Sequence, residues 1–345
     1  MRYLSTLAFP PAWLDELRAA VPGVDVVQLP AASAADVPAD VWRGVDALHT
    51  SSVLPEPGDA PRLRWVQLDT SGVDHVRDTA LWRSDVEITT IGGVSPVPLA
   101  QYVLFCILGF AHRLPAMLDV RAARHWPTAQ VRWDAFLPAA LDGATVAIVG
   151  YGRIGREIGR LARTHGMSVV GVTRSGRRPD PAGAGQVEFG VAAGGFAVDP
   201  TADDADVRVV GPELLADVLA TADYLVVVVP LTEHTRGLIG RRTLAALKPG
   251  AVVINVARGG VVDESALLHA LRSGAVAGAA LDVFDEEPLP PTSPWWHEPN
   301  VLVTPHVSGL APRYFEQVRR IVTDNLRRFV DGAPLLNRVD RERGY

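Results

Sequence analysis

Cysteine is almost absent from this sequence, which has 345 residues and a single cysteine, Cys106. One thiol cannot form a disulfide within the chain, and it excludes a metal site built from clustered cysteines. Cys106 lies in the apolar run QYVLFCILGFAHR, where a buried thiol is expected to pack rather than react. The cysteine usage is typical of a reducing compartment, so we expect a cytoplasmic protein.

Long hydrophobic runs and an excess of basic residues are missing as well. No stretch reaches the roughly 18 uninterrupted apolar residues that a membrane span requires, and Pro10 and Pro11 break the N-terminal run, which argues against a signal peptide. The formal net charge of -6 gives no general attraction for nucleic acid or anionic membrane. The histidines show no paired spacing such as HExxH, so we expect no metal site.

A glycine-rich turn is the first feature that points to a function. The apolar run ATVAIV leads into Gly150-Tyr151-Gly152-Arg153-Ile154-Gly155, and REIGRLARTHG follows with helical spacing. Strand, tight turn and helix in this order are typical of a dinucleotide-binding fingerprint. The first glycine allows the turn, the second lets the backbone approach a pyrophosphate, and the third lets helix and strand pack closely.

Alternating strand and helix signals extend over most of the chain and predict an α/β fold with two Rossmann-like, doubly wound domains and parallel sheets. Residues 1–98 form one such series, and a second runs from about 144 to 305. A terminal amphipathic helix after His306 is expected to return to the first domain. We therefore predict a discontinuous substrate domain, 1–98 plus 307–345, into which an NAD(P)-binding domain, 99–306, is inserted.

Two segments stand out from this alternation. The run LAQYVLFCILGFAHRL is apolar on most faces, which predicts a buried helix. The stretch from Pro179 to about Val210 is rich in Gly, Ala, Pro and Asp and is longer than most connections. It is either a mobile loop or a small hairpin built on QVEFGVAAGGFAV, and it serves as surface decoration or as a lid or subunit contact.

Three residues far apart in the sequence each follow an apolar, strand-like run. Arg258 follows AVVINV, Glu287 follows AVAGAALDVF and His306 follows NVLVTP. Ligands bind at the carboxyl ends of parallel strands, so these side chains could converge on one crevice. In carbonyl reduction, negative charge develops on oxygen: a guanidinium can polarise the carbonyl, an imidazolium can supply the proton, and a carboxylate can orient the imidazole.

The chain resembles the D-isomer-specific 2-hydroxyacid dehydrogenases, a family that includes glyoxylate and hydroxypyruvate reductases. The resemblance covers nearly the whole chain and rests on segments in the family's order and spacing. These are LDTSGVDHV, VGYGRIGREIGRLARTHGM, VVVVPLTEHTRGLIG, LKPGAVVINVARGGVVDESALLHAL, GAALDVFDEEPLP and NVLVTPHVSG.

The resemblance assigns a role to each residue of the predicted site. Arg258 binds the carboxylate and carbonyl oxygen of the substrate, His306 is the acid and base, and Glu287 is its partner. The similar formate dehydrogenases carry a neutral amide in place of this glutamate, so Glu287 argues against formate as the substrate.

Further binding positions follow from the resemblance. Backbone amides of a turn in the first domain bind the substrate carboxylate, and these belong to Ser71, Gly72 and Val73. An ordinary tight turn remains the alternative there. Asp282 would hold the nicotinamide amide, although it could instead cap the turn that follows its strand. The remaining positions expected to contact the cofactor are Pro230, Thr235, Val256 and Ala257.

The choice of nicotinamide depends on the loop after SVVGVT. NAD-preferring relatives end this strand in Asp, which binds the ribose hydroxyls, whereas here Thr173 is followed by Arg174, Ser175, Gly176 and Arg177. A small hydroxyl and nearby guanidinium groups suit a 2'-phosphate. We therefore expect NADP(H) to be favoured over NAD(H), with a solvated basic loop as the alternative.

Together these features predict an oxidoreductase that reduces a small 2-keto acid, such as glyoxylate or hydroxypyruvate, to the D-2-hydroxy acid. Two alternatives stay open: a nucleotide-sensing regulator of the same fold, and a dehydrogenase of another small anion such as phosphite. The family implies a homodimer, and no nucleic acid or membrane partner is expected.

Overall fold

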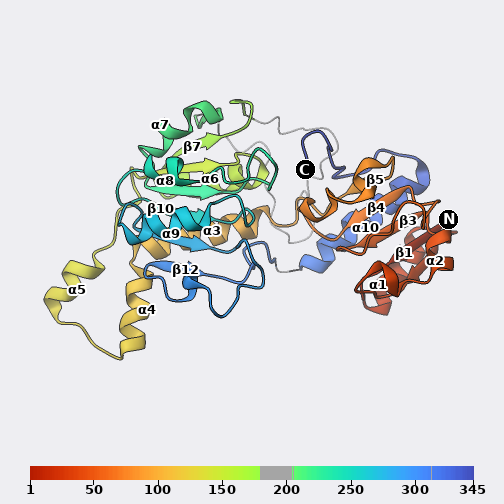
Figure 1. The fold of residues 1–345 in the computed structure, drawn as a ribbon, viewed down its shortest axis with the longest axis horizontal. Coiled ribbons are helices and arrows are strands. Elements are labelled where there is room, and N and C mark those ends of the chain that lie inside the picture. The colour runs from red at the N-terminus through yellow and green to blue at the C-terminus, as the bar shows by residue number, and fades with distance from the viewer. Residues whose placement is uncertain (179–203, 205, 312) are drawn as a thin grey trace. The chain divides into compact units, whose positions relative to one another are not determined.

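The computed structural model describes residues 1–178, 204, 206–311 and 313–345. Two compact units are present: Met1–Val94 with Ala311–Tyr345 form the smaller one, and the described residues from Ser95 to Leu310 form the larger one (Figure 1). The hairpin expected over QVEFGVAAGGFAV lies outside the described residues.

The larger unit is built on a seven-stranded, wholly parallel sheet with the order β12-β11-β10-β9-β6-β7-β8. The strand order reverses between β6 and β9, which is the place where a doubly wound sheet binds its ligand. The sequence did not predict β8, which forms one edge of the sheet. The strands are β6 (Thr145–Val149), β7 (Ser168–Val172), β8 (Arg208–Val210), β9 (Tyr224–Val227), β10 (Val252–Asn255), β11 (Gly278–Leu281) and β12 (Val301–Val303).

Helices cover both faces of this sheet because its strands are apolar on both sides. On β6, Val146 and Ile148 share a core with α3 and α6, whereas Ala147 and Val149 share the opposite core with α7, α8 and α9. The helices are α3 (Pro96–Ala111), α4 (Leu114–Ala123), α5 (Ala129–Phe136), α6 (Arg153–Arg163), α7 (Leu215–Leu219), α8 (Arg241–Ala245) and α9 (Glu264–Arg272), with short 3₁₀ turns at η4 (Pro212–Leu214) and η5 (Pro294–Trp296).

The predicted apolar helix is α3, and it begins at Pro96 because a proline in the first helical turn gives up no hydrogen bond. Beyond it, α4 and α5 were not predicted, and Figure 1 shows them projecting away from the sheet of the larger unit. Within the described part of the chain, no single helix is long and apolar enough to cross a membrane. Helices α3 and α4 reach that length and hydropathy only together, and that pair is bent by 66°.

The smaller unit has a five-stranded parallel sheet with the order β2-β1-β3-β4-β5. Helices α1 and α10 pack on one face, and α2 packs on the other. Its elements are β1 (Arg2–Ser5), α1 (Pro11–Ala20), β2 (Asp25–Gln28), η1 (Ala34–Asp36), α2 (Ala39–Gly44), β3 (Ala47–Thr50), β4 (Trp65–Leu68), η2 (Asp74–Val76), η3 (Ala80–Arg83), β5 (Glu87–Thr89) and α10 (Tyr314–Asp331). Two doubly wound α/β units with parallel sheets confirm the predicted fold class.

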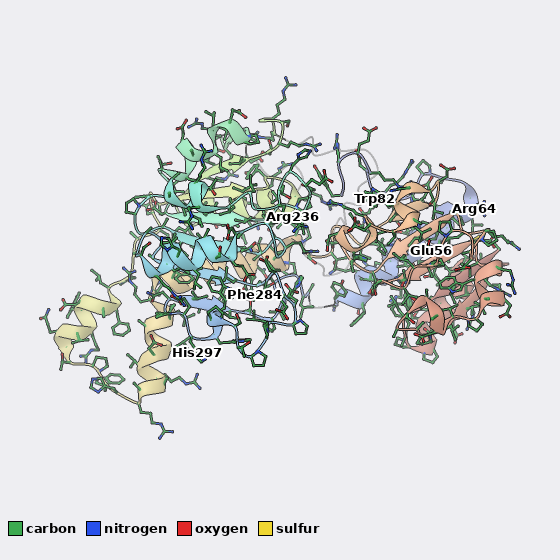
Figure 2. All side chains as sticks on the ribbon, in the orientation of Figure 1. Glu56, Arg64, Trp82, Arg236, Phe284 and His297 are labelled. Carbon is green, nitrogen blue, oxygen red and sulfur yellow. The ribbon has the colours of Figure 1, made fainter. Side chains whose placement is uncertain are left out.

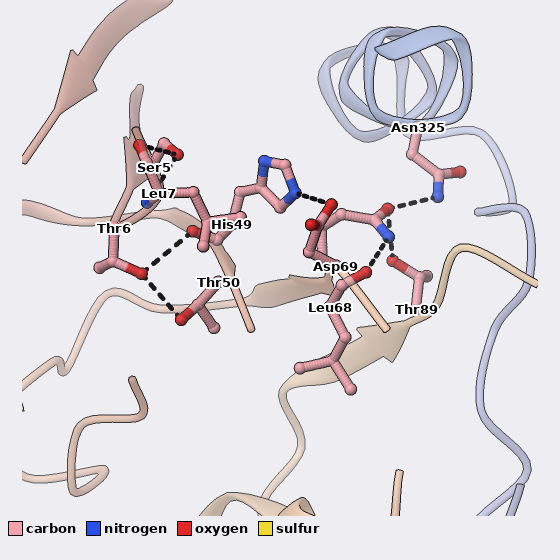
Figure 3. Close-up of polar contacts among 10 residues, drawn as sticks. Ser5, Thr6, Leu7, His49, Thr50, Leu68, Asp69, Thr89 and Asn325 are labelled. Atoms are coloured by element: carbon pink, nitrogen blue, oxygen red, sulfur yellow. Dashed lines mark hydrogen bonds and ion pairs between the residues drawn. The ribbon is translucent and has the colours of Figure 1, made fainter. Parts of the chain in front are cut away.

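A buried polar contact ties the C-terminal helix α10 to the sheet of the smaller unit. Asn325 is fully buried and donates to Gln67 Oε1 over 2.9 Å; Thr89 donates to the same oxygen over 2.9 Å (Figure 3). The side-chain oxygen of Asn325 accepts from the Leu336 amide over 2.7 Å. These bonds fix the helix on the sheet, where apolar packing alone would allow it to slide.

Candidate functional site

The three predicted catalytic residues lie beyond three neighbouring strands of the larger sheet. Arg258 follows β10, Glu287 follows β11 and His306 follows β12, and these strands are adjacent in this order. A Cβ added to Gly259 would stand 2.0 Å from the carbonyl oxygen of Phe284, so the loop after β10 presses against the loop after β11. Phe284, labelled in Figure 2, is buried beneath the loops.

His306 and Glu287 form the central pair of the site. The Nδ1 atom of His306 lies 2.7 Å from Glu287 Oε2, while the amide of Phe284 donates to Glu287 Oε1 over 2.9 Å. A carboxylate can only accept, so Nδ1 carries the proton of this bond and Nε2 is left for a substrate. The side chains of His306 and Glu287 are 44% and 35% exposed, so the pair is accessible to a ligand.

The backbone at His306 has the left-handed conformation, with φ of 54°, which costs energy for a residue with a side chain. Asp282 holds this loop from below: its carbonyl oxygen accepts from the His306 amide over 2.9 Å, and its carboxylate accepts from the amides of Val307 and Ser308 over 2.9 and 2.8 Å. The Asp282 side chain is fully buried. These contacts resemble the turn-capping alternative, whereas a contact with the nicotinamide stays a prediction.

Arg258 is half-buried at the same edge of the sheet. Its Nη1 donates to the carbonyl oxygen of Ala257 over 2.7 Å, and the Ala257 amide donates to Asn255 Oδ1 over 3.2 Å. Val256 and Ala257 are each only 4% exposed, so this segment is firmly seated. The backbone that carries Arg258 is therefore held rigidly at the end of its strand.

The glycine fingerprint has the geometry that a pyrophosphate site needs. Gly150 has a φ of +108°, and a Cβ at Gly155 would stand 2.2 Å from the Gly150 carbonyl oxygen, so both positions require glycine. A Cβ at Gly152 would meet nothing within 4 Å. Gly152 is the N-cap of α6, whose first residues are Arg153 and Ile154. An open backbone at a helix N-terminus suits the anionic part of a dinucleotide.

The loop after β7 presents the residues expected to choose between nicotinamide cofactors. Thr173 donates its hydroxyl proton to the carbonyl oxygen of Arg177 over 2.9 Å, and the Arg177 amide donates to Ser175 Oγ over 3.3 Å. Arg174 is exposed and forms no hydrogen bond or ion pair with another described residue. The Thr173 hydroxyl thus shapes the loop, and the Arg174 guanidinium is available to a ligand.

The loop after β9 is organised by its own hydroxyl groups. Thr235 donates to the carbonyl oxygen of Pro230 over 2.6 Å, and the amide of Thr232 donates to Thr235 Oγ1 over 2.7 Å. Strand β9 adjoins β6, so this loop follows the strand on the far side of the switch point. A rigid loop at this position suits the predicted contact with the cofactor.

The predicted carboxylate-binding turn belongs to the smaller unit. It follows β4, and Thr70 closes it by donating to the Gly72 carbonyl oxygen over 2.8 Å. Ser71 is exposed and Val73 is 3% exposed, so the turn is anchored on one side and open on the other. Its contact with substrate stays a prediction.

Sequence reasoning missed two polar pairs near these loops. His49 is fully buried with Nε2 3.3 Å from Asp69 Oδ1, immediately before the turn at residues 70–73 (Figure 3). The hydroxyl groups of Tyr102 and Thr304 lie 2.6 Å apart. The members of each pair come from separate elements, so no local spacing could reveal them.

Other kinds of chemistry find no support among the described residues. They contain no group of three or more His, Cys, Asp or Glu side chains placed to hold a metal ion. Cys106 is fully buried, and burial raises the pKa of its thiol to about 12. A protonated, buried thiol is a poor nucleophile, which confirms its predicted packing role.

Comparisons with known proteins agree with this geometry. The family model described as "D-isomer specific 2-hydroxyacid dehydrogenase, NAD binding domain" matches residues 104–193 and 186–308. A glyoxylate reductase of Thermococcus gammatolerans is 31% identical over 311 residues, covering 87% of this chain and 84% of the relative. An (S)-sulfolactate dehydrogenase of Chromohalobacter salexigens is 36% identical over 273 residues, covering 78% of each chain.

A solved structure resembles the whole chain. It is a D-isomer specific 2-hydroxyacid dehydrogenase from Xanthobacter autotrophicus Py2, in complex with NADPH and MES, with 32% identity, a TM-score of 0.78 and coverage of 100% of both chains. The family match and the identity over most of the chain confirm the resemblance found in the sequence. The chain therefore belongs to the NAD(P)-dependent D-isomer specific 2-hydroxyacid dehydrogenases.

Proposed function

We propose that this enzyme reduces a small 2-keto acid, such as glyoxylate or hydroxypyruvate, to the D-2-hydroxy acid, with NADPH as the preferred donor. The observation that carries the proposal is the 2.7 Å bond between His306 Nδ1 and Glu287 Oε2. It leaves Nε2 available as a proton donor at the edge of the sheet where the cofactor of such a fold binds. The glyoxylate reductase among the relatives supports the substrate class.

Each of the three proposed catalytic residues has a distinct task. Arg258 binds the substrate carboxylate and polarises the carbonyl oxygen, on which negative charge develops. His306 delivers a proton from Nε2 to that oxygen, and Glu287 holds the ring and stabilises its protonated form. The reduced nicotinamide, when bound, supplies the hydride to the carbonyl carbon. In the reverse direction His306 accepts the hydroxyl proton.

The remaining positions line the cofactor and the substrate. The segment Gly150–Gly155 holds the pyrophosphate, and the backbone amides of residues 71–73 bind the substrate carboxylate. Residues 1–98 with 307–345 act as the substrate domain, and residues 99–306 act as the cofactor domain. The wall around the nicotinamide and its ribose is made by Pro230, Thr235, Val256, Ala257 and Asp282.

The preference for NADPH rests on the exposed guanidinium of Arg174 and on the absence of an acidic residue at Thr173. A 2'-phosphate would meet a cation there, with the Ser175 hydroxyl as a second donor. The related Xanthobacter structure contains NADPH, which supports this choice. Arg174→Ala should weaken NADPH binding much more than NADH binding. Equal loss with both cofactors would contradict the assignment.

The substrate class is tested by following the absorbance of NADPH and NADH separately with glyoxylate, hydroxypyruvate, pyruvate and longer 2-keto acids. Sulfolactate is included in the oxidation direction because one relative is named for it. His306→Ala should lower kcat by about 100- to 10,000-fold while cofactor binding is kept. If cofactor binds but no acid is turned over, a sensor, or an enzyme for another anion such as phosphite, replaces this proposal.

We also propose that the enzyme is a cytoplasmic homodimer that pairs through the projecting α4 and α5. Among the described residues, 12 large hydrophobic side chains are exposed, and six of them lie within residues 114–137, including Trp126 at 82% and Trp133 at 70% exposure. Apolar surface gathered in this way marks an interaction site. Trp133→Ser should convert the dimer to a monomer in sedimentation, whereas Trp296→Ser, elsewhere on the larger unit, should not. An unchanged assembly state after Trp133→Ser would exclude this interface.

A further inference from the structure

Helix α3 contacts the segment that carries His306 at two points, and both lie within the larger unit. Near its N-terminus, Ser95 Oγ donates to the Gly309 carbonyl oxygen over 2.9 Å. About two helical turns further on, the Tyr102 hydroxyl lies 2.6 Å from Thr304 Oγ1. The segment of residues 304–309 is therefore tied to α3 on either side of His306.

The contact at Thr304 continues to a buried charge. Thr304 Oγ1 donates to Asp282 Oδ1 over 2.6 Å, and the amides of Val307 and Ser308 donate to the same carboxylate. Among the described residues, this fully buried carboxylate forms no ion pair and is satisfied by hydrogen bonds. A charge without a counter-ion depends strongly on each donor that it has.

The direction of these bonds follows from counting protons. An ionised carboxylate can only accept, so Thr304 must use its single hydroxyl proton on Asp282. Thr304 Oγ1 can then only accept from Tyr102, which fixes Tyr102 as the donor. Burial raises the pKa of Tyr102 well above its ordinary value of 10.0, so its hydroxyl keeps the proton that this arrangement needs. The hydrogen bonds therefore run in one direction, from Tyr102 to Thr304 and from Thr304 to Asp282.

We propose that Tyr102 is a positioning residue for proton transfer, acting through Thr304 and Asp282 to hold His306 in its left-handed backbone conformation. The bond from Tyr102 polarises the Thr304 hydroxyl and strengthens its bond to Asp282. That bond fixes the carboxylate in the position where it accepts from the amides of Val307 and Ser308. The inference rests on the proposed role of His306 as the acid and base. Tyr102 itself touches neither substrate nor cofactor in this scheme.

The first test compares Tyr102→Phe with the wild type in the reduction of a 2-keto acid. Removing one hydroxyl from the series should lower kcat about fivefold to tenfold, with little change in the dissociation constant for NADPH. Tyr224→Phe is the matched control, because Tyr224 lies in the same core and its hydroxyl bonds to no other described residue. It should leave kcat unchanged.

A double-mutant cycle tests whether the hydroxyl groups act in series. Thr304→Val should lower kcat at least as much as Tyr102→Phe, and Thr304→Ser should restore most of the loss because the hydroxyl returns. In the Thr304→Val background, Tyr102→Phe should have no further effect, since its hydroxyl then has nothing to act on. Additive losses would overturn the proposal.

A measurement without turnover separates this proposal from the proposed function. In Tyr102→Phe, but not in Tyr224→Phe, hydrogen exchange at the amides of Val307 and Ser308 should be accelerated severalfold. If the wild type reduces a 2-keto acid but Tyr102→Phe leaves kcat and exchange unchanged, only the positioning role is wrong. If the wild type reduces none, the proposed function fails, whereas accelerated exchange would still show that Tyr102 holds this loop.

Discussion

Replacing Glu287 with glutamine tests the central pair of the site with a change of charge and almost none of shape. Glu287 accepts two hydrogen bonds, one from His306 Nδ1 and one from the Phe284 amide. A glutamine side chain has only one oxygen, so Glu287→Gln leaves one of these donors facing an NH₂ group. The variant loses the negative charge beside the imidazole and one of the two bonds as well.

The size of the effect follows from the exposure of the pair. A hydrogen bond to a charged group contributes about 1.5 to 3 kcal/mol, and solvent screening favours the lower end because the two side chains are 44% and 35% exposed. A loss of about 1.5 kcal/mol corresponds to roughly tenfold in kcat/KM for reduction.

The assay is kcat/KM for keto-acid reduction, measured for the wild type and Glu287→Gln. Glu286→Gln is the matched control: Glu286 is the exposed preceding residue and forms no bond with another described residue. It should keep the wild-type kcat/KM. No loss in Glu287→Gln, or an equal loss in Glu286→Gln, would refute the assignment of Glu287 as the partner of His306.

Three further predictions concern the cofactor loop and the stability of each unit. Gly155→Ala should lower Tm and weaken NADPH binding in a fluorescence titration, because its Cβ would stand 2.2 Å from the Gly150 carbonyl oxygen. Gly152→Ala should weaken binding in the same titration but keep Tm. Asp263 caps α9, and the hydrogen bonds that its carboxylate accepts from Ala266 and Ser265 lower its pKa below 3.8. Asp263→Ala should therefore cost about 1 kcal/mol in urea unfolding at pH 7, and the difference should shrink as the pH falls through the lowered pKa. Asn325→Ala should cost about 1 to 3 kcal/mol in the smaller unit, because it leaves the partly buried Leu336 amide without its acceptor; an unchanged urea midpoint would contradict this.

Much of the fold could be predicted from the sequence because its signals are local. The β-branched runs before Gly150, Arg258 and His306 each became a strand, and Gly155 packs against the Gly150 backbone as the spacing of the fingerprint indicated. Strand β8 and the helices α4 and α5 were missed, since their stretches are short or weakly patterned. Their structure depends on neighbours that a local pattern does not contain.

The candidate site divides in the same way. Arg258, Glu287 and His306 could be named in advance because residues after parallel strands share one edge of the sheet. The pair of His49 and Asp69 could not be named, because His49 lies in β3 and Asp69 follows β4, so no local pattern joins them. The contact of Tyr102 with Thr304 was hidden for the same reason, since 202 positions separate the two residues.

The sequence alone thus determined the family, the fold class and the chemical types gathered at the site, because these depend on local periodicity and on motifs that keep their order along the chain. Only the tertiary structure decided which groups support those residues. The Asp282 carboxylate was expected to hold the nicotinamide amide or to cap the turn after its strand. In the fold it accepts from Thr304 and from the two amides after His306. A buried polar group must find its partners wherever the fold brings them, and sequence distance does not limit that choice.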